Sequence, residues 1–433
     1  SSMSSYKRTW ISKSMSIFSG GVELKQIGVE DPFQYLGVFY TLDKGVENKF
    51  HLLEVESVLH RISKLALKPR QKILFLHTYV LPKFFYIWIA SFAGQSFLSS
   101  LDANIRQFLK KWLKLPLSIT DCVFYTAKKD GGLGFPKLAH LIGLAQLKFA
   151  HTARMQKGIM DKVIDKDKLT KIENAIAIAL KLERPYNLKS LTHKKKHLKE
   201  ETFVLWTGQK SQGKGIEYYK NDPLANAFLY DDSVVPDNRF IDCIRLRTNN
   251  VGVRVAIART GQDMDVSCRY CKAPLETLGH VLGQCVFDAG RRISRHNRIV
   301  QLLAKHFQMR GYGIALEPTI QYNSSTLKPD LIITRGNSRV LLDVTVRFED
   351  EGMCERAMQE KKDKYEVLKN FFKDGKTFSV VPIVLGSRGS LPVYTRNYFK
   401  KISLPKFIQR KIAQLTLLSS VEICNCHMDY QGH

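Results

Sequence analysis

The strongest constraint on the fold is a hairpin pattern in the last quarter of the sequence. Two runs of aliphatic and β-branched residues, 331–334 and 339–346, are separated only by the string RGNS. This pattern predicts a β-hairpin whose two-residue turn is Gly336-Asn337. In that register Asp330 lies opposite Asp343, and directly opposed residues bring their Cβ atoms to about 4.5–5.5 Å. Because two carboxylates repel at that separation, the hairpin predicts a divalent cation between them.

A helix is predicted to follow the hairpin, over residues 350–372, because apolar residues recur there at 3.6-residue spacing. The apolar stripe consists of Cys354, Ala357, Met358, Tyr365, Leu368 and Phe372. Lys361 lies in the middle of this stripe, Lys362 points about 100° away, and Lys364 lies at its edge. A lysine on an apolar face beside two carboxylates is suited to meet a phosphate or an attacking water. An ordinary amphipathic helix, with a lysine that reaches to solvent, is the alternative interpretation.

A second chemical pattern is Cys268-x2-Cys271-x8-His280-x4-Cys285. Two cysteines separated by two residues chelate one ion from a tight turn, and the later histidine and cysteine complete a tetrahedron. Three sulfurs and one nitrogen predict Zn²⁺, and a site with all four positions filled is expected to be structural. Chance spacing of scattered cysteines is the alternative.

The hairpin residues resemble a known nuclease family. Pro329-Asp330, then Asp343, then a lysine resembles the PD-(D/E)xK nuclease core. The sequence departs from that pattern at Thr345, where the motif has its lysine, and Lys361 in the following helix is assigned that role. With the Cys and His pattern upstream, the arrangement resembles the restriction-like endonuclease of site-specific non-LTR retrotransposons of the R-two type, which insert into ribosomal DNA.

The resemblance implies nicking of target DNA at a site with two carboxylates and a metal ion. Asp330 and Asp343 would hold Mg²⁺, and Lys361, with Lys364 as the reserve, would orient the nucleophilic water. Glu317, in the segment before the core, is a candidate further ligand; a glutamate at a strand edge is the preferred interpretation.

The chain carries a large excess of positive charge. Its 433 residues include 67 Lys and Arg against 40 Asp and Glu, a net charge of +27. This imbalance predicts a polyanionic partner. We expect no membrane span, because no segment reaches about 20 apolar residues, and the longest apolar stretch, 84–94, is interpreted as a buried helix. We also expect no secretory leader and, from eight cysteines without a disulfide framework, a reducing compartment.

The expected fold class is α+β with several domains. Residues 1–50 contain the string QYLGVFY, a strand and turn that resembles the last strand motif of a reverse transcriptase palm, before the thumb. Residues 51–140 are expected to form a helical thumb, for which a plain helical bundle is the alternative. Residues 141–260 are expected to be a helical and basic linker, 261–310 the CCHC zinc knuckle with a basic helix, and 311–433 the α/β restriction-like endonuclease.

Within the linker, residues 140–182 are predicted to form two helices. Residues 184–222 are polar and rich in lysine, which indicates a linker or a mobile surface segment. The pair Asp231-Asp232 is rejected as a polymerase site, because its surroundings are loop-like. Beyond the hairpin, 378–385 is expected to add a strand to the nuclease sheet.

Six residues are candidate nucleic-acid contacts: Arg245, Arg247, Arg291, Arg295, His296 and Arg298. The last three arginines share one face of a predicted helix, which suits contact with a DNA backbone. The run at 295–297 also matches a motif of the retrotransposon family, and a core or capping histidine is the alternative for His296. Near the end of the chain, Cys424, Cys426 and His427 are too few for a metal site, and a disordered tail is predicted.

These expectations combine into one hypothesis: the carboxy-terminal half of a retrotransposon reverse transcriptase and endonuclease, without the polymerase active site. It would bind target DNA, ribosomal DNA by analogy, and element RNA, and would nick one DNA strand to prime reverse transcription. It would act in the nucleus or, within it, the nucleolus. A nucleic-acid-binding module without catalysis and a cellular PD-(D/E)xK repair nuclease are the alternatives.

Overall fold

The computed structural model describes residues 2–6, 9–13, 16–24, 26–43, 45–155, 166–372 and 375–429. The chain divides into two units. The N-terminal unit comprises Ser1–Leu113 and Pro136–Leu198, and the C-terminal unit comprises Lys114–Phe135 and Lys199–His433.

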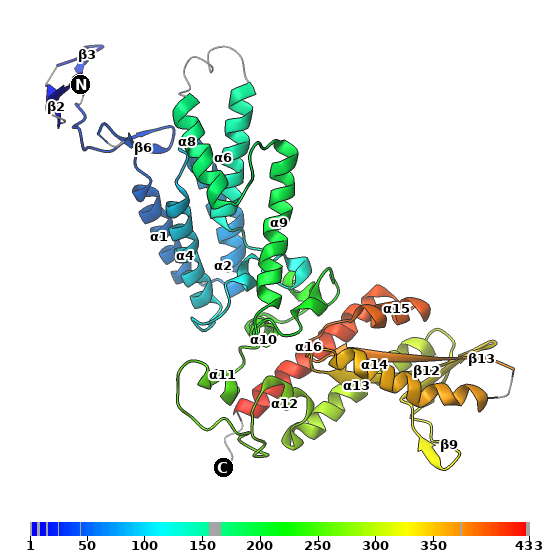
Figure 1. Ribbon diagram of the computed structural model, residues 1–433. Coiled ribbons are helices and arrows are strands. Elements are labelled where there is room, and N and C mark those ends of the chain that lie inside the picture. The colour runs from blue at the N-terminus through cyan, green and yellow to red at the C-terminus, as the bar shows by residue number, and fades with distance from the viewer. Residues whose placement is uncertain are drawn as a thin grey trace. The chain divides into compact units, whose positions relative to one another are not determined.

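The N-terminal unit consists of short strands followed by helices (Figure 1). Its strands are β1 Ser2–Tyr6, β2 Thr9–Lys13, β3 Phe18–Ser19, β4 Val22–Glu23, β5 Phe33–Tyr35, β6 Val38–Thr41 and β7 Gly45–Val46. Its helices are α1 Lys49–Lys64, α2 Pro69–Phe75, a π-helical turn Leu76–Val80, α3 Leu81–Ala90, α4 Gln95–Trp112, α6 Leu138–Met155, α8 Lys166–Ala179 and the first half of α9 Leu188–Thr207. The predicted strand and turn at QYLGVFY are therefore confirmed, as are the helices expected after residue 50 and over 140–182.

Asp102 fastens α4 to the start of α6. Its side chain is buried, and its two carboxylate oxygens accept hydrogen bonds from the backbone N–H groups of Leu138 and Ala139, at 2.8 and 3.0 Å. These N–H groups have no partner within their own helix, so a buried carboxylate satisfies both. Burial raises the pKa of Asp102 to about 6, although the two backbone hydrogen bonds oppose the shift.

The prediction that no apolar segment is long enough to span a membrane is wrong. Helices α2 and α3 are continuous through the π-helical turn, so Pro69–Ala90 is a helical run of 22 residues, and its most apolar stretch of 18 residues has a mean hydropathy of 1.5. Pro82 lies in the first turn of α3, where a missing N–H is tolerated. Core helices can have the same length and composition, and Phe84 and Trp88 of this run are buried.

The C-terminal unit contains the remaining helices and the main sheet. Its helices are α5 Cys122–Tyr125, the second half of α9, α10 Asp237–Arg247, α11 Arg254–Ala258, α12 Leu278–Gly283, α13 Ala289–Gln308, α14 Met353–Glu366, α15 Val393–Lys401 and α16 Lys406–Asp429. Short 3-10 turns lie at Lys128–Asp130, Ile216–Tyr219, Ala227–Leu229, Val286–Asp288 and Val367–Asn370.

The prediction of a linker or mobile segment over 184–222 is wrong for most of its length. Helix α9 covers Leu188–Thr207, and a 3-10 turn follows at Ile216–Tyr219. The lysine-rich composition indicated a linker because the lysines of α9 lie on its exposed face, whereas Leu191, Leu198 and Trp206 are buried.

A mixed four-stranded sheet forms the core of the C-terminal unit, in the order β13-β12-β11-β8 (Figure 1). The strands are β8 Gly313–Leu316, β11 Leu331–Arg335, β12 Ser338–Arg347 and β13 Thr377–Gly386. Strands β12 and β13 are parallel, and α14 connects them; the other pairs are antiparallel. A separate hairpin is formed by β9 Ile320–Tyr322 and β10 Ser325–Leu327. The α+β class and the strand predicted at 378–385 are confirmed.

The hairpin register is as predicted. Arg335 pairs with Ser338 and Leu331 pairs with Leu342, so Gly336-Asn337 is the turn. Gly336 has a φ of 53°, a left-handed conformation that glycine adopts without steric cost.

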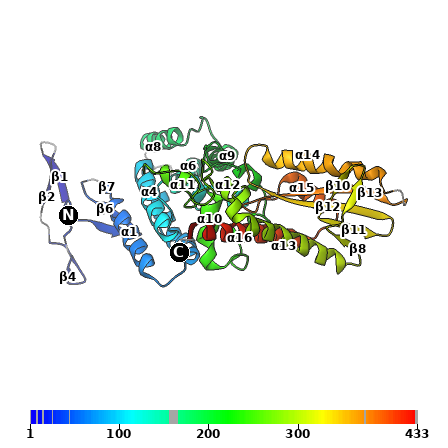
Figure 2. The ribbon, with the colours of Figure 1, turned by 90° about the horizontal axis from the view of Figure 1, so that it is seen from below.

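Helices cover both faces of the sheet, with α14 on one side and α13 on the other (Figure 2). One face packs against α13, α15 and α16 through a cluster that includes Ile299, Val344, Ile383, Phe399 and Ile412. The other face packs against α14 through Leu341, Tyr365 and Leu368, among others. The apolar stripe predicted for this helix is correct, since Cys354, Ala357, Tyr365 and Leu368 are buried.

The prediction of a disordered C-terminal tail is wrong for the described residues. Helix α16 extends to Asp429, and Cys424 and His427 are buried. Residues 430–433 lie outside the described part of the chain. The prediction failed for a physical reason. Helix α16 is buried on several sides, so its apolar residues are spread around the helix and do not form the single stripe by which a helix is recognised in a sequence.

Candidate metal and carboxylate sites

The two aspartates predicted from the hairpin lie side by side at its open end. Asp343 is in the middle of β12 and is 1% exposed, and Asp330 directly precedes β11. The pairing of Leu331 with Leu342 is the last in the described register, and Asp330 and Asp343 are the next residues beyond it. Asp330 Oδ2 accepts a hydrogen bond from the backbone N–H of Val344 at 2.6 Å, which holds its carboxylate against β12.

Lys361 meets the buried aspartate, as its position on the apolar stripe predicted. Its Nζ lies 2.7 Å from Asp343 Oδ1. Among the described residues this oxygen accepts no hydrogen bond of regular geometry, so the contact is an ion pair that leaves acceptor capacity unused. Burial raises the pKa of Asp343, the negative charge of Asp330 adds to the rise, and Lys361 opposes it.

The structure distinguishes the two candidate lysines. Lys364 is exposed, and its Nζ lies over the ring of Tyr365, 5.0 Å from the centroid. The hydroxyl of Tyr365 in turn donates to the carbonyl oxygen of Lys328 at 3.0 Å. Lys361 is therefore the lysine paired with the carboxylates, whereas Lys364 contacts the aromatic ring behind them.

His296 is a member of this site that the sequence analysis assigned to nucleic-acid binding. Its Nε2 lies 3.0 Å from Asp330 Oδ2 and 3.1 Å from the carbonyl oxygen of Val344. The hydrogen bond to Asp330 and the charge of that carboxylate raise the pKa of His296 to about 9, although burial opposes the shift. One signal could have identified it: His296 lies three and seven residues before Ile299 and Leu303, on the buried stripe of α13.

Glu317 lies at the neighbouring strand end. Its backbone N–H donates to the carbonyl oxygen of Asp330 at 3.0 Å, and the pairing of Leu316 with Leu331 places it directly opposite that aspartate. The side chain of Glu317 is exposed. A strand-edge position, as preferred from the sequence, agrees with this geometry.

Two of the arginines predicted to bind nucleic acid are buried instead. Arg247 is 0% exposed and stacks on Tyr219, with its guanidinium carbon 3.4 Å from the ring centroid. Arg295 is 3% exposed and donates to Ser420 Oγ at 2.8 Å and to the carbonyl oxygen of Leu282 at 3.1 Å. Neither side chain faces solvent, so the prediction of phosphate contact is wrong for both. Helical spacing placed Arg295 correctly beside its neighbours, but α16 covers that part of the helix.

The other three predicted arginines are partly accessible. Arg298 is 52% exposed and Arg291 is 36% exposed; the latter pairs with Asp288 at 3.2 Å. Arg245 is half-buried and donates to the carbonyl oxygen of Lys114. Contact of these three with nucleic acid stays a prediction.

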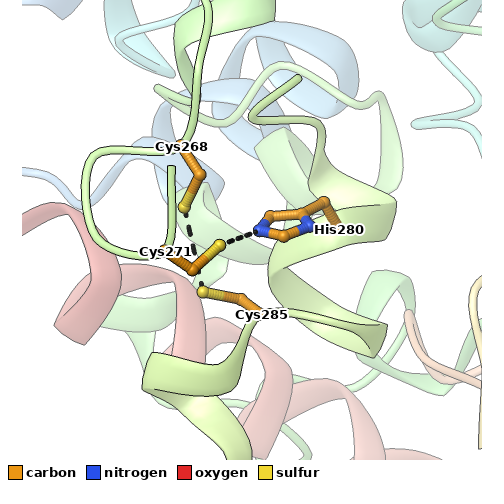
Figure 3. A group of neighbouring side chains, drawn as sticks. All are labelled: Cys268, Cys271, His280 and Cys285. Atoms are coloured by element: carbon orange, nitrogen blue, oxygen red, sulfur yellow. Dashed lines mark hydrogen bonds between the residues drawn. The ribbon is translucent and has the colours of Figure 1, made fainter. Parts of the chain in front are cut away.

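The four residues of the cysteine and histidine pattern converge (Figure 3). Their ligand atoms all lie within 4.8 Å of one another. Cys268 Sγ is 3.8 Å from Cys285 Sγ, and Cys271 Sγ is 3.2 Å from His280 Nε2. The first two cysteines come from a turn, whereas His280 lies on α12, whose first turn is capped by the hydroxyl of Thr277. This group, called the knuckle below, could hold a metal ion.

Sequence comparison places these features in a family. The chain is 26% identical over 365 residues to the "Retrovirus-related Pol polyprotein from type-2 retrotransposable element R2DM" of Drosophila melanogaster, covering 82% of the chain and 33% of that protein. It is also 26% identical to Pol polyproteins from type-1 retrotransposable element R2 of Bradysia coprophila and Popillia japonica. Those alignments cover 75% and 83% of the chain and 37% and 49% of those proteins. These similarities support an R2-type non-LTR retrotransposon protein. No family model matches it.

The resemblance drawn from the hairpin and the knuckle is thereby confirmed at the level of the family. This R2-type chain spans between a third and a half of the length of these three relatives.

Proposed function

We propose that this R2-type protein nicks one strand of DNA by Mg²⁺-dependent phosphodiester hydrolysis. The observation that carries the proposal is the pairing of Lys361 with Asp343, at 2.7 Å, beside Asp330 across the hairpin. A buried carboxylate, a second carboxylate opposite it and a lysine are the groups that such hydrolysis uses.

The carboxylate pair suits a divalent cation. Asp343 Oδ1 is buried and accepts no regular hydrogen bond among the described residues, so it has a lone pair to offer. Hard cations such as Mg²⁺ prefer carboxylate oxygens, and a cation here would relieve the repulsion that raises the pKa of Asp343. A Mg²⁺ ion bound by Asp330 and Asp343 would activate water and neutralise charge on the leaving oxygen.

Two other side chains of the site, Lys361 and His296, position the reacting groups. Lys361, whose side chain is 26% exposed, presents its ammonium both to Asp343 and to solvent, where it would orient the attacking water and attract the scissile phosphate. His296 holds Asp330 from the opposite side, so the carboxylate keeps one orientation. Glu317 lies at a strand edge and has no role in the proposed reaction.

The knuckle is proposed to bind Zn²⁺ as a structural site. Three thiolates and one imidazole supply the usual donor set, and burial of three of the four residues fits a site that water does not enter. Its position directly before α13 would fix the helix that carries His296.

The partners proposed are double-stranded target DNA, ribosomal DNA by analogy, and element RNA, and the location proposed is the nucleus. The net charge of +27 supports binding to polyanions. The released 3′-hydroxyl would prime reverse transcription, and the helices after residue 50 are proposed to act as a thumb.

The test is a nicking assay on supercoiled plasmid in Mg²⁺, with and without an R2-type target. The wild type is compared with Asp330→Ala, Asp343→Ala and Lys361→Ala, and with Lys362→Ala as a matched control on an exposed position of the same helix. We expect nicking by the wild type and by the Lys362→Ala protein only, while all variants still bind DNA.

Two outcomes contradict the proposal. A wild type that binds DNA and never nicks would leave the chain as a binding module. Equal nicking by the wild type and the three site variants would show that hydrolysis occurs elsewhere in the preparation.

A further inference from the structure

The last turn of α16 reaches the knuckle through one buried side chain, His427. Its Nδ1 lies 2.6 Å from Asp288 Oδ2, and its Nε2 lies 3.3 Å from Glu276 Oε2. The side chain is 0% exposed. Each ring nitrogen therefore faces a carboxylate oxygen, so the ring links the side chains of Asp288 and Glu276.

The two carboxylates belong to the knuckle itself. Glu276 lies between Cys271 and His280, and Asp288 lies three residues after Cys285. His427 thus joins two separate segments that supply knuckle residues. In Figure 3, α16, in pink, passes beside the four side chains.

Glu276 is fixed from the other side as well. It accepts hydrogen bonds from the backbone N–H groups of Arg254 and Arg269 at 2.9 Å each, and from the Arg269 guanidinium at 2.7 Å. With both oxygens occupied and the side chain buried, Glu276 is a rigid anchor for the His427 ring.

His427 also lies against a thiol of the knuckle. Its Nε2 is 4.0 Å from Cys268 Sγ, and its ring packs edge-on against Tyr270, with centroids 4.9 Å apart. His427 therefore contacts the knuckle in two ways, directly at the ligand Cys268 and through the carboxylates of Glu276 and Asp288.

We propose that His427 is a positioning residue of the metal centre, so that α16 supports a site whose four ligands lie within residues 268–285. The inference rests on the proposed metal centre and adds a residue to it that no ligand spacing indicates. It assigns α16 two roles: packing on the sheet through Ile412 and Ala413, and stabilising the metal centre through His427.

The test uses the full chain, loaded with Zn²⁺ or Co²⁺. Zn²⁺ affinity is measured by competition with a chromophoric chelator for the wild type, His427→Ala, His427→Gln and Leu417→Ala. The last variant removes a buried side chain from the same helix away from the knuckle, so it reports loss of packing alone. Removal of an outer hydrogen-bonding partner costs about 10–100-fold in metal affinity.

We expect a loss of that size for His427→Ala, a smaller one for His427→Gln, which keeps a donor and an acceptor, and none for Leu417→Ala despite a lower melting temperature. The Co²⁺ spectrum of His427→Ala should keep its tetrahedral d–d bands, while the thiolate charge-transfer band shifts.

Equal loss of affinity in His427→Ala and Leu417→Ala would overturn the proposal, because packing alone would explain it. Collapse of the d–d bands in His427→Ala, with His280→Ala unaffected, would also overturn it by making His427 a direct ligand. A wild type that binds neither ion would instead refute the metal centre itself, and the inference with it.

Discussion

Two buried carboxylates on the same stretch of chain, Asp343 and Glu349, have opposite surroundings. Glu349 is 0% exposed, and its oxygens accept from the Tyr219 hydroxyl at 2.8 Å, from the Arg388 guanidinium at 3.1 Å, and from Ser390 Oγ at 3.0 Å. Asp343 is as deeply buried, but its Oδ1 forms an ion pair with Lys361 and accepts no hydrogen bond of regular geometry from the part of the chain that the structure describes. A saturated carboxylate holds segments together, whereas an unsaturated one is available for a ligand.

The direction of the pKa shift separates the two sites in the same way. Burial acts to raise the pKa of both carboxyls, but other groups decide the direction of the final shift. At Glu349 the charge of Arg388 and the hydrogen bond from Tyr219 outweigh burial, and the pKa is lowered. At Asp343 the charge of Asp330 adds to burial, and the pKa is raised. The fold thus favours the ionised form of Glu349 and disfavours the ionised form of Asp343.

The largest effect is expected for Asp343→Asn. Nicking should fall by about 10²–10⁴-fold, the contribution typical of a positioned catalytic group. The free energy of unfolding should stay the same or rise, because a buried charge with unused acceptor capacity is removed. The two measurements are plasmid nicking under single-turnover conditions and unfolding in urea. A variant that is strongly destabilised but still active would show that Asp343 has a structural role, like the one inferred for Glu349.

The next effect is expected for Glu349→Gln. It leaves Arg388 buried without its counter-charge, and the loss of one partner from a buried ion pair costs about 3–5 kcal/mol. Unfolding in urea should show this loss, with nicking retained wherever the protein stays folded. The double variant Glu349→Gln with Arg388→Met is the control and should recover part of the stability. A loss below about 1 kcal/mol would mean that this buried ion pair contributes no more to the free energy of unfolding than an ion pair on the surface.

A smaller loss is expected for Asp102→Ala in the N-terminal unit. Two backbone N–H groups at the start of α6 would lose their acceptor in a buried place, at a cost of about 1–3 kcal/mol. The change should appear as a lower melting temperature, and nicking should not change at a temperature where the variant is folded. If Asp102→Ala and Asp102→Asn were equally stable, the capping contacts would contribute nothing.

The smallest effect is a pH dependence of the same residue. Because the folded protein raises the pKa of Asp102 to about 6, it holds the proton more tightly than the unfolded chain does. Protonation therefore favours folding, and this contribution is lost as the pH rises through about 6. Asp102→Asn should remove that part of the slope between pH 4 and 7. An identical slope in the variant would assign the pH dependence to other groups.

The features that could be predicted from the sequence depend on residues that lie close together along the chain. The knuckle ligands lie within 18 positions of one another, and the hairpin register follows from its turn, so both were predictable. Lys361 was placed correctly by helical periodicity.

What failed depends on packing between distant segments. His296 meets Asp330, and His427 meets Asp288, only because separate helices are brought together by the sheet. Arg247 and Arg295 are buried for the same reason, since spacing identifies a helix face but not the element that covers it.

Helix α13 has a consequence for the distance between the knuckle and the carboxylate pair. It begins at Ala289, shortly after Cys285, and carries His296, which contacts Asp330. The step from Cys285 to His296, at about 1.5 Å per residue, is roughly 16 Å, or about half of the ~34 Å turn of B-DNA. If the knuckle and the carboxylate pair contact the same duplex, the base pairs at the knuckle and the nick would lie within one turn of each other. This offset would stay constant when the DNA sequence between them is changed.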